Sequence, residues 1–429
     1  MADSLAARSR LTVVTVMGIG QVLVWGSSYY LPAVLAQPIA DRTGWPLSWV
    51  IGALSLALLV SGLVSPKVGA LIERHGGRPI LMASAALMAV GLATLAMAPD
   101  LAVFTLGWLV LGGAMGTGLY DPAFAALGRL YGNGARAAIT SLTLIGGFAS
   151  TACWPLSAVL LERFGWRGTC LAYATINLLV VLPLYRFGLP AEAPSVRVAA
   201  PRRAALPAGD AGRGHAGRGH AGRGDGGAMA PAAPVMRGDA RYRLLFFLVA
   251  VTMTLSSIIA AVVSVHLLTI LQQRGVALGT AVALGAVVGP CQVGARLIDL
   301  LAGQRTHPVW EGLLSAVFVS LGLGLLLAQR DAVLVGLVVY GGGIGLRSIV
   351  RGTLPLALFG PVGYPSLVGR LALPMLLGQA AAPSAGAVLL EHFGGRSVVT
   401  ALLWTALATL VLSAMLVSFA RQPQVRSAG

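Results

Sequence analysis

The sequence predicts an all-α membrane protein with twelve transmembrane helices in two pseudo-symmetric six-helix bundles. Three observations predict this fold class. Of the 429 residues, 57% are hydrophobic and only 10% are charged, whereas an average soluble domain has about 25% charged residues. Apolar stretches long enough to span a bilayer, roughly 20 residues each, recur along the whole chain. A segment of the first half also recurs in the second half. The composition excludes a water-soluble fold.

The predicted helices follow the uninterrupted apolar stretches. The first stretch is too long for the core of a cleaved signal peptide, so we expect it to be a retained first span. Several stretches exceed the length that a bilayer requires, which indicates tilted helices or helices that extend beyond the bilayer. In chain order the predicted helices cover residues 11–40, 47–72, 79–98, 101–131, 136–162, 166–187, 242–272, 276–301, 307–328, 332–358, 365–390 and 396–420.

The segment 189–241 differs in composition from the rest of the chain. It is rich in Ala, Pro, Gly and Arg, and it contains AGRGHAGRGHAGRGD from Ala211 to Asp225. Because it lacks the apolar content to build a core, we predict a disordered cytoplasmic linker. The linker divides the chain into an N-terminal six-helix bundle, residues 1–188, and a C-terminal six-helix bundle, residues 242–429.

The basic residues predict the orientation. If both termini lie in the cytoplasm, 24 of the 30 Lys and Arg residues fall on the cytoplasmic side, which is the excess that membrane proteins show there. The net charge of +16 would suggest a nucleic-acid partner in a soluble chain. Here membrane topology accounts for it, and no nucleic acid is expected. The preference for Arg over Lys, with abundant Ala and Gly, favours a bacterial inner membrane.

An internal repeat supports two homologous halves. SAVLLERFGWRG at 157–168 and GAVLLEHFGGRS at 386–397 agree at eight of twelve positions with an offset of 229 residues. The first copy closes the fifth predicted helix and the second closes the eleventh. A weaker echo relates 69–73 to 294–299. Two parallel six-helix repeats are an architecture of alternating-access carriers.

The loop after the second predicted helix carries a signature. It reads GALIERHGGRPIL from Gly69 to Leu81 and resembles the Gly-x-Leu-x-Asp-Arg-x-Gly-x-Arg-x-x-Leu motif of the major facilitator superfamily, with Glu73 in place of Asp. The resemblance covers essentially the whole chain. It implies that this loop is a conformational latch formed by Gly69, Glu73, Arg74, Gly76 and Arg78. The alternative is a charge cluster that only sets topology.

The eighth predicted helix shows a narrower resemblance. GPCQVGARL at 289–297 is similar to the equivalent segment of monocarboxylate carriers and oxalate–formate exchangers, which implies that Arg296 binds a substrate carboxylate. Gln292 stands where proton-coupled members have Asp, and this counts against proton symport through that helix. The first and tenth helices also resemble arsenical-efflux permeases. Gly112 occupies the position of the arginine of proton–drug antiporters, which disfavours multidrug efflux.

Ionisable residues within predicted spans are candidates for transport, because burying charge in a bilayer is costly. Asp121 lies in the fourth helix, and Arg347 and Arg351 lie one turn apart in the tenth. The repeat offset maps Asp121 next to Arg347, so we expect these two to pair across the halves. Arginine suits an anion site because it stays charged and binds carboxylate bidentately. The alternatives are that the two arginines snorkel to the interface and that Asp299 neutralises Arg296.

Three further residues complete the candidate set. Tyr29 and Tyr30 offer hydroxyl groups to a central site, although aromatic residues also serve as interfacial anchors. His266 is a candidate for proton coupling, because histidine is the side chain suited to proton transfer near physiological pH, with helix packing as the alternative.

These features predict a secondary transporter of a small organic anion or oxyanion. Efflux of arsenicals or other toxic compounds is the alternative, and a receptor with the same fold is a third reading. The sequence shows no nucleophile–base pair, nucleotide-binding loop or metal-ligand cluster. We therefore expect no enzyme, no cofactor and no metal. The expected partners are a small-molecule substrate, protons and the lipid bilayer, and the expected oligomeric state is a monomer.

Overall fold

The computed structural model describes residues 9–192, 240–302, 306–328 and 332–421. Most of the predicted linker lies outside the described residues. Regular secondary structure within the described ranges is helical. The first half contains α1 (Arg10–Gly26), α2 (Pro32–Thr43), α3 (Leu47–His75), α4 (Gly77–Met97), α5 (Leu101–Gly118), α6 (Tyr120–Tyr131), α7 (Ala135–Gly146), α8 (Ala149–Ile176) and α9 (Leu182–Gly188). The second half contains α10 (Ala240–Gln273), α11 (Leu278–Leu301), α12 (Pro308–Leu327), α13 (Val333–Phe359) and α14 (Tyr364–Arg421).

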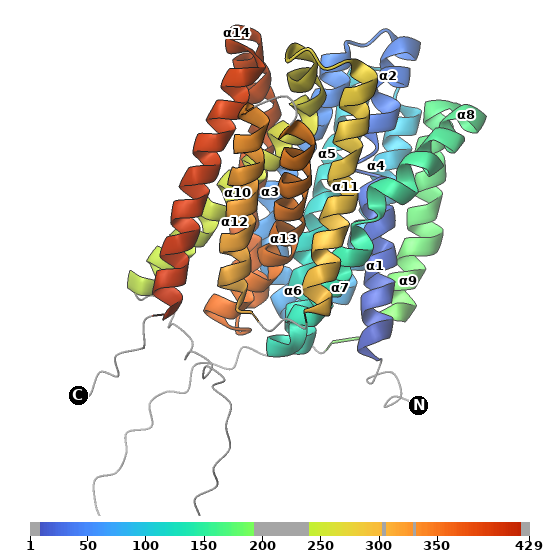
Figure 1. Ribbon diagram of the computed structural model, residues 1–429. Coiled ribbons are helices and arrows are strands. Elements are labelled where there is room, and N and C mark those ends of the chain that lie inside the picture. The colour runs from blue at the N-terminus through green and yellow to red at the C-terminus, as the bar shows by residue number, and fades with distance from the viewer. Residues whose placement is uncertain (1–8, 193–239, 303–305, 329–331, 422–429) are drawn as a thin grey trace, which may run out of the picture.

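The predicted twelve spans are confirmed. Eight continuous helical stretches of the described chain are long and apolar enough to cross a membrane. Two of them contain internal reversals, so that together they supply eleven passes, and α1 with α2 forms the twelfth (Figure 1). α8 turns at Gly165, with φ of 67°, and α14 turns at Gly394, with φ of 74°. These glycines are one repeat offset apart, and both need the left-handed conformation that glycine adopts without strain.

Three spans predicted as single helices are interrupted near their middles. α1 and α2 are separated by a turn at 27–31, α5 and α6 by Leu119, and α7 and α8 by Gly147 and Phe148. Gly and Ser residues lie at or just before these breaks, and Pro32 begins α2. Apolarity alone could not reveal the breaks, because broken helices keep their apolar composition.

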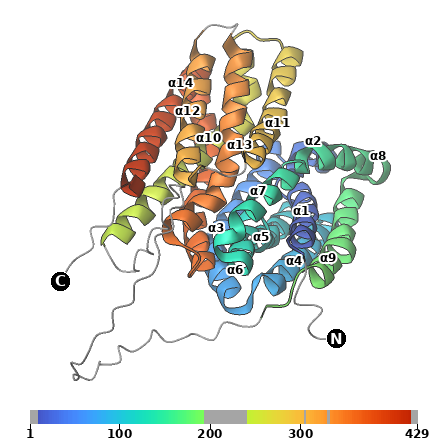
Figure 2. The same cartoon turned by 60° about the horizontal axis from the view of Figure 1, so that its bottom comes forward.

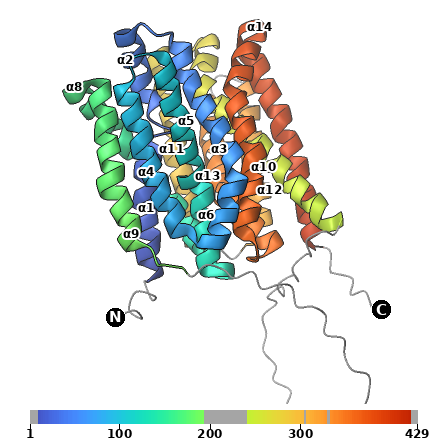
Figure 3. The same cartoon turned by 180° about the vertical axis from the view of Figure 1, so that it is seen from behind.

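The two halves form two adjacent bundles, which Figure 2 shows as separate groups, blue to green and yellow to red. We call the end of the molecule where α1 begins and α14 ends the terminal face (Figure 1). α3 packs along the first part of α14, as Figure 3 shows from behind. Near the terminal face a Cβ on Gly69 would overlap the carbonyl oxygen of Pro365, and a Cβ on Gly369 would overlap that of Ser65. Glycine therefore lets these helices approach closely.

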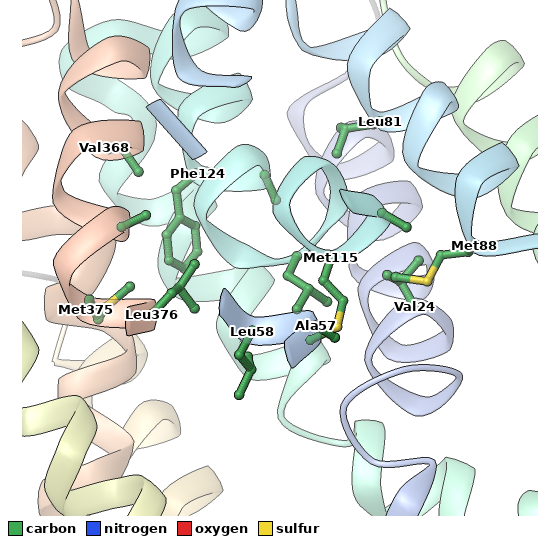
Figure 4. Packing of buried hydrophobic residues seen from close by; sticks show 14 of the residues in the cluster. Val24, Ala57, Leu58, Leu81, Met88, Met115, Phe124, Val368, Met375 and Leu376 are labelled. Carbon is green, nitrogen blue, oxygen red and sulfur yellow. The ribbon is translucent and has the colours of Figure 1, made fainter. Parts of the chain in front are cut away.

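The apolar core also crosses the boundary between the bundles. Met115 of α5 and Phe124 of α6 belong to the same buried cluster as Met375 and Leu376 of α14 (Figure 4). Away from the terminal face, a hollow of about 570 Å³, open to the surroundings, lies between α2 and α8 and is lined by Val34, Thr151 and Trp154. At the terminal face, by contrast, α3 and α14 are in close contact, and we describe that face as closed.

Candidate transport site between the bundles

An ion pair joins the bundles at the centre of the molecule. The break at Leu119 places Asp121 in the first turn of α6, where the helix dipole favours a carboxylate. The Nε and Nη2 atoms of Arg351 donate to the two oxygens of Asp121, at 2.8 and 2.5 Å. The prediction that Asp121 pairs with Arg347 was wrong by one helical turn. The repeat offset locates equivalent positions along a helix but does not determine which side chain faces the other bundle.

Arg347 lies inside the molecule, one turn before Arg351. Its Nη1 donates to the hydroxyl of Ser257 at 3.2 Å, and its buried Nε has no hydrogen-bond partner. Within the described chain, no carboxylate lies within 4 Å of it. Arg347 and Arg351 line a cavity of about 40 Å³ between α10, α12, α13 and α14. Both guanidinium groups are thus positioned in the interior.

Arg296 is buried in α11, with 6% of its surface exposed. Its Nη1 donates to the carbonyl oxygen of Thr143 in the other bundle at 2.9 Å, next to the α7–α8 break, and its Nη2 donates to Gln292 at 3.4 Å. Its Nε has no partner. Asp299 does not pair with it, contrary to the alternative considered from the sequence. Asp299 instead interacts with Arg136 and Glu311.

Four aromatic rings gather beside the ion pair. The Trp25 ring lies 5.3 Å from the Tyr29 ring, 5.9 Å from the Tyr30 ring and 5.0 Å from the Tyr120 ring, between centroids. Trp25 and Tyr29 line a second, small cavity of about 10 Å³ together with Asp121 and Arg351. Arg351 therefore borders both cavities. Sequence analysis missed Tyr120, although its position directly before Asp121 was a usable signal.

The structure does not bring His266 to this site. The His266 ring nitrogen Nε2 lies 2.8 Å from the carbonyl oxygen of Pro383, within the C-terminal bundle, and His266 lines neither cavity. This contact is the packing role that was the alternative to coupling. Within the described chain, no cluster of three or more His, Cys, Asp or Glu residues could hold a metal ion.

The signature loop connects α3 and α4 at the terminal face. Gly76, with φ of 86°, ends α3. The hydroxyl of Ser366 in the other bundle donates to the carboxylate of Glu73. Arg129 of α6 donates to the backbone oxygen of Glu73 and to Glu192, the latter at 2.5 Å.

The two arginines predicted to cluster with Glu73 take no part in these contacts. Arg74 and Arg78 form no ion pair in the described part of the chain. The partners that the structure supplies, Arg129, Glu192 and Ser366, were not identified from the sequence because they are distant along the chain.

A second cluster joins the bundles at the same face. Arg136, at the start of α7, forms an ion pair with Glu311 at the start of α12, and Asp299 of α11 lies beside them. The weak sequence echo aligns Asp299 with Glu73. The two clusters are therefore related by the internal repeat, and each joins an acidic residue after one span to the other bundle.

Comparison with known sequences gives one family and several partial relatives. The model of the Major Facilitator Superfamily matches residues 17–361. Monocarboxylate transporter 11 of Homo sapiens is 33% identical over 167 residues, which are 37% of this chain and 35% of that protein. Tetracycline resistance protein, class G, of Vibrio anguillarum is 28% identical over 169 residues, which are 36% and 41%. The aligned part thus spans about a third of the length of the first curated relatives.

Solved structures agree in fold across nearly the whole chain. The human organic anion transporter MFSD10 (TETRAN) superposes with a TM-score of 0.68 at 16% identity, covering 95% of this chain and all of that one. The transporter FucP in its outward conformation gives a TM-score of 0.68 at 11% identity, covering 97% and 100%. These similarities concern the fold. Because the family model covers most of the sequence and the fold agrees, the chain belongs to the major facilitator superfamily of membrane transporters.

Proposed function

We propose that this protein is a secondary transporter of a small organic anion and that the anion binds to Arg347 and Arg296. The proposal rests on two buried arginines near the centre of the molecule that have no carboxylate partner in the described part of the chain. Arg351 is neutralised by Asp121, whereas Arg347 and Arg296 have no carboxylate within 4 Å in the described residues. Their buried Nε atoms have no partner. Buried cations of this kind require a counter-charge, and a carboxylate or oxyanion substrate supplies it.

The ion pair between Asp121 and Arg351 provides the coupling step in this proposal. Protonation of Asp121 removes its charge and weakens its two hydrogen bonds to Arg351, because charged hydrogen bonds are the stronger ones. The central link between the bundles then loosens, and the bundles can rock around the site. Arg351 stays charged throughout and becomes available to the anion. Tyr29, Tyr30 and Gln292 line the path to the arginines in this scheme.

The setting of this activity follows from charge and composition. We place the protein in a bacterial inner membrane as a monomer, with both termini cytoplasmic and residues 189–241 as a cytoplasmic linker. The closed terminal face is then the cytoplasmic face, and the substrate reaches the site from the opposite side. The contacts of Glu73 and Arg136 hold that face closed.

Efflux of arsenicals or other toxic compounds is the second candidate. It is favoured by the partial similarity to a tetracycline resistance protein and by the half-buried thiol of Cys291, which directly precedes Gln292 in α11. The positive charge of Arg347 and Arg296 at the centre of the molecule favours transport of an organic anion instead.

The test is transport by the full chain in proteoliposomes that contain a pH-sensitive dye. The panel is monocarboxylates, dicarboxylates and arsenicals. We expect uptake of one carboxylate class with proton movement, and Arg347→Gln is expected to abolish it. Arg163→Gln is the matched control, because Arg163 is exposed and outside both cavities. Transport of arsenicals alone, or unchanged carboxylate transport in Arg347→Gln, would contradict the proposal.

A further inference from the structure

The centre of the molecule contains more aromatic surface than an anion site requires. Trp25, Tyr29 and Tyr30 come from the interrupted first span and Tyr120 from the start of α6. All four rings are partly exposed although they lie between helices. The hydroxyls of Tyr30 and Tyr120 make no hydrogen bond among the described residues. Trp25 and Tyr29 line the small central cavity, so part of this aromatic surface faces it.

The orientation of these rings is set by contacts behind them. The indole Nε1 of Trp25 donates to Oε1 of Gln21 at 3.1 Å, and Nε2 of Gln21 donates to the carbonyl oxygen of Gly118 at 2.7 Å. Gly118 ends α5, so Gln21 satisfies a carbonyl group at the α5–α6 break. Tyr120 stacks on Phe124, with an interplanar angle of 5° and a centroid distance of 5.3 Å. The platform is thus preorganised, which lowers the entropic cost of binding.

Two arginines of the other bundle lie in the same region as these rings. A Cβ on Gly146 would lie 2.6 Å from the Tyr120 hydroxyl, and a Cβ on the next residue, Gly147, would overlap Nη1 of Arg296. Tyr120 and Arg296 therefore flank the same helix break. Arg351 and Tyr29 line one cavity. One bundle supplies π surface and the other supplies positive charge.

A chain of rings also connects this site to the open hollow between α2 and α8. Trp154 lines that hollow and meets the Tyr30 ring edge-on, with centroids 6.1 Å apart. Tyr30 in turn contacts Tyr29 and Trp25. The ring cluster is therefore continuous from the hollow to the centre of the molecule.

We propose that the substrate is an aromatic carboxylate, whose ring packs on the Trp25–Tyr120 platform while its carboxylate meets Arg296 and Arg347. This inference rests on the proposed anion transport and adds the chemical class of the anion. Offset or edge-to-face ring contacts are favoured beyond simple burial by up to about tenfold in affinity per pair. Saturated acids of the same charge lack this contribution.

The experiment compares two probes that differ in aromatic character. Benzoate and cyclohexanecarboxylate have the same charge and a similar size, and their affinities for the purified full-length protein are measured by calorimetry. We expect benzoate to bind at least about tenfold more tightly. Trp25→Leu and Tyr120→Leu should remove this preference while weak binding of both acids remains, and Trp25→Phe should retain it. Trp49→Leu, at an exposed position on α3, is the control.

The outcomes separate the two proposals. Equal affinity for the two acids, or a preference that persists in both leucine variants, overturns the aromatic assignment and leaves anion transport intact. If neither benzoate, cyclohexanecarboxylate nor acetate binds to a protein that remains monodisperse, both proposals fail. A preference lost in both leucine variants and kept in Trp49→Leu supports the assignment.

Discussion

Three arginines in similar apolar sequence have different surroundings in the structure. Arg351 is paired bidentately with Asp121, Arg347 reaches only the hydroxyl of Ser257, and Arg296 meets a backbone carbonyl and Gln292. Arg347 and Arg351 are separated by a single turn, so their different environments come from the direction of each side chain relative to the opposite bundle. The Arg351–Asp121 contact is therefore a structural ion pair, whereas Arg347 and Arg296 are the candidate anion-binding groups.

Breaking the central ion pair one partner at a time tests this division. We expect Arg351→Gln and Asp121→Asn each to destabilise the protein by about 3–5 kcal/mol, because each leaves a buried group without its partner. The double variant should recover most of this loss. Thermal unfolding in detergent measures the effect, with Arg163→Gln as the control. Losses in the two single variants that simply add in the double variant would contradict a direct interaction.

At the scale of elements, interrupted helices build the site. The breaks after Gly26, Gly118 and Gly146 bring the Trp25–Tyr30 segment, Tyr120 and Asp121, and the carbonyl oxygen of Thr143 to one region. Interrupted helices place helix termini and backbone carbonyls where a substrate can use them, which carriers exploit near the bilayer centre. The unbroken α3 and the first part of α14 instead provide the close packing between the bundles.

The close contact between α3 and α14 predicts that replacing a glycine lowers stability at some positions and not at others. Gly69→Val adds a branched side chain against the Pro365 carbonyl, so we expect a loss of stability of about 1–3 kcal/mol from overpacking. A Cβ on Gly113 meets open space, and Gly113→Val is expected to be nearly neutral. Both are measured by thermal unfolding in the same detergent. Equal losses would mean that the close approach at Gly69 does not contribute to stability.

At the scale of the whole molecule, two repeat-related clusters join the bundles at the terminal face. One joins Glu73 to Ser366 and the other joins Arg136 to Glu311. A pseudo-symmetric molecule that rocks about a central site needs equivalent contacts on both sides of its axis. The repeated acidic positions, Glu73 and Asp299, provide them. The loop signature in the sequence therefore marks only one of the two clusters that join the bundles at this face.

Loss of either cluster should shift the equilibrium towards a state that is open at the terminal face. Arg136→Gln removes one charged hydrogen bond, typically worth about 1.5–3 kcal/mol, which corresponds to at least a tenfold change in population. Spin labels at positions 71 and 370, in a cysteine-free background, report the distance between the bundles. Leu334→Gln on the exposed surface of α13 is the control. An unchanged distance distribution in Arg136→Gln would show that this cluster does not maintain closure.

The orientation in the membrane is a separate prediction of the whole molecule. A single cysteine in place of Arg42, in the last turn of α2, is expected to react with a membrane-impermeant maleimide on intact cells. A cysteine at His215 is expected to react only after permeabilisation. The opposite pattern would reverse the topology and place the closed face outside.

The membrane class, the twelve spans, the two repeated halves and the family could all be predicted from the sequence. These depend on apolar length and on local motifs such as Gly69–Leu81, which the chain carries without its neighbours. The sequence also identified the ionisable residues within the spans, because charge in a bilayer stands out.

Which of these residues contact one another depends on the packing of the helices in three dimensions. The sequence alone did not reveal that Asp121 pairs with Arg351, that Ser366 binds Glu73, that Asp299 lies beside Arg136, or that Tyr120 contacts Trp25. A pairing across the bundles depends on where each helix breaks and how it is rotated about its axis. Both are set by side-chain packing between segments distant in sequence, and apolar periodicity carries little of that information when nearly every residue is apolar.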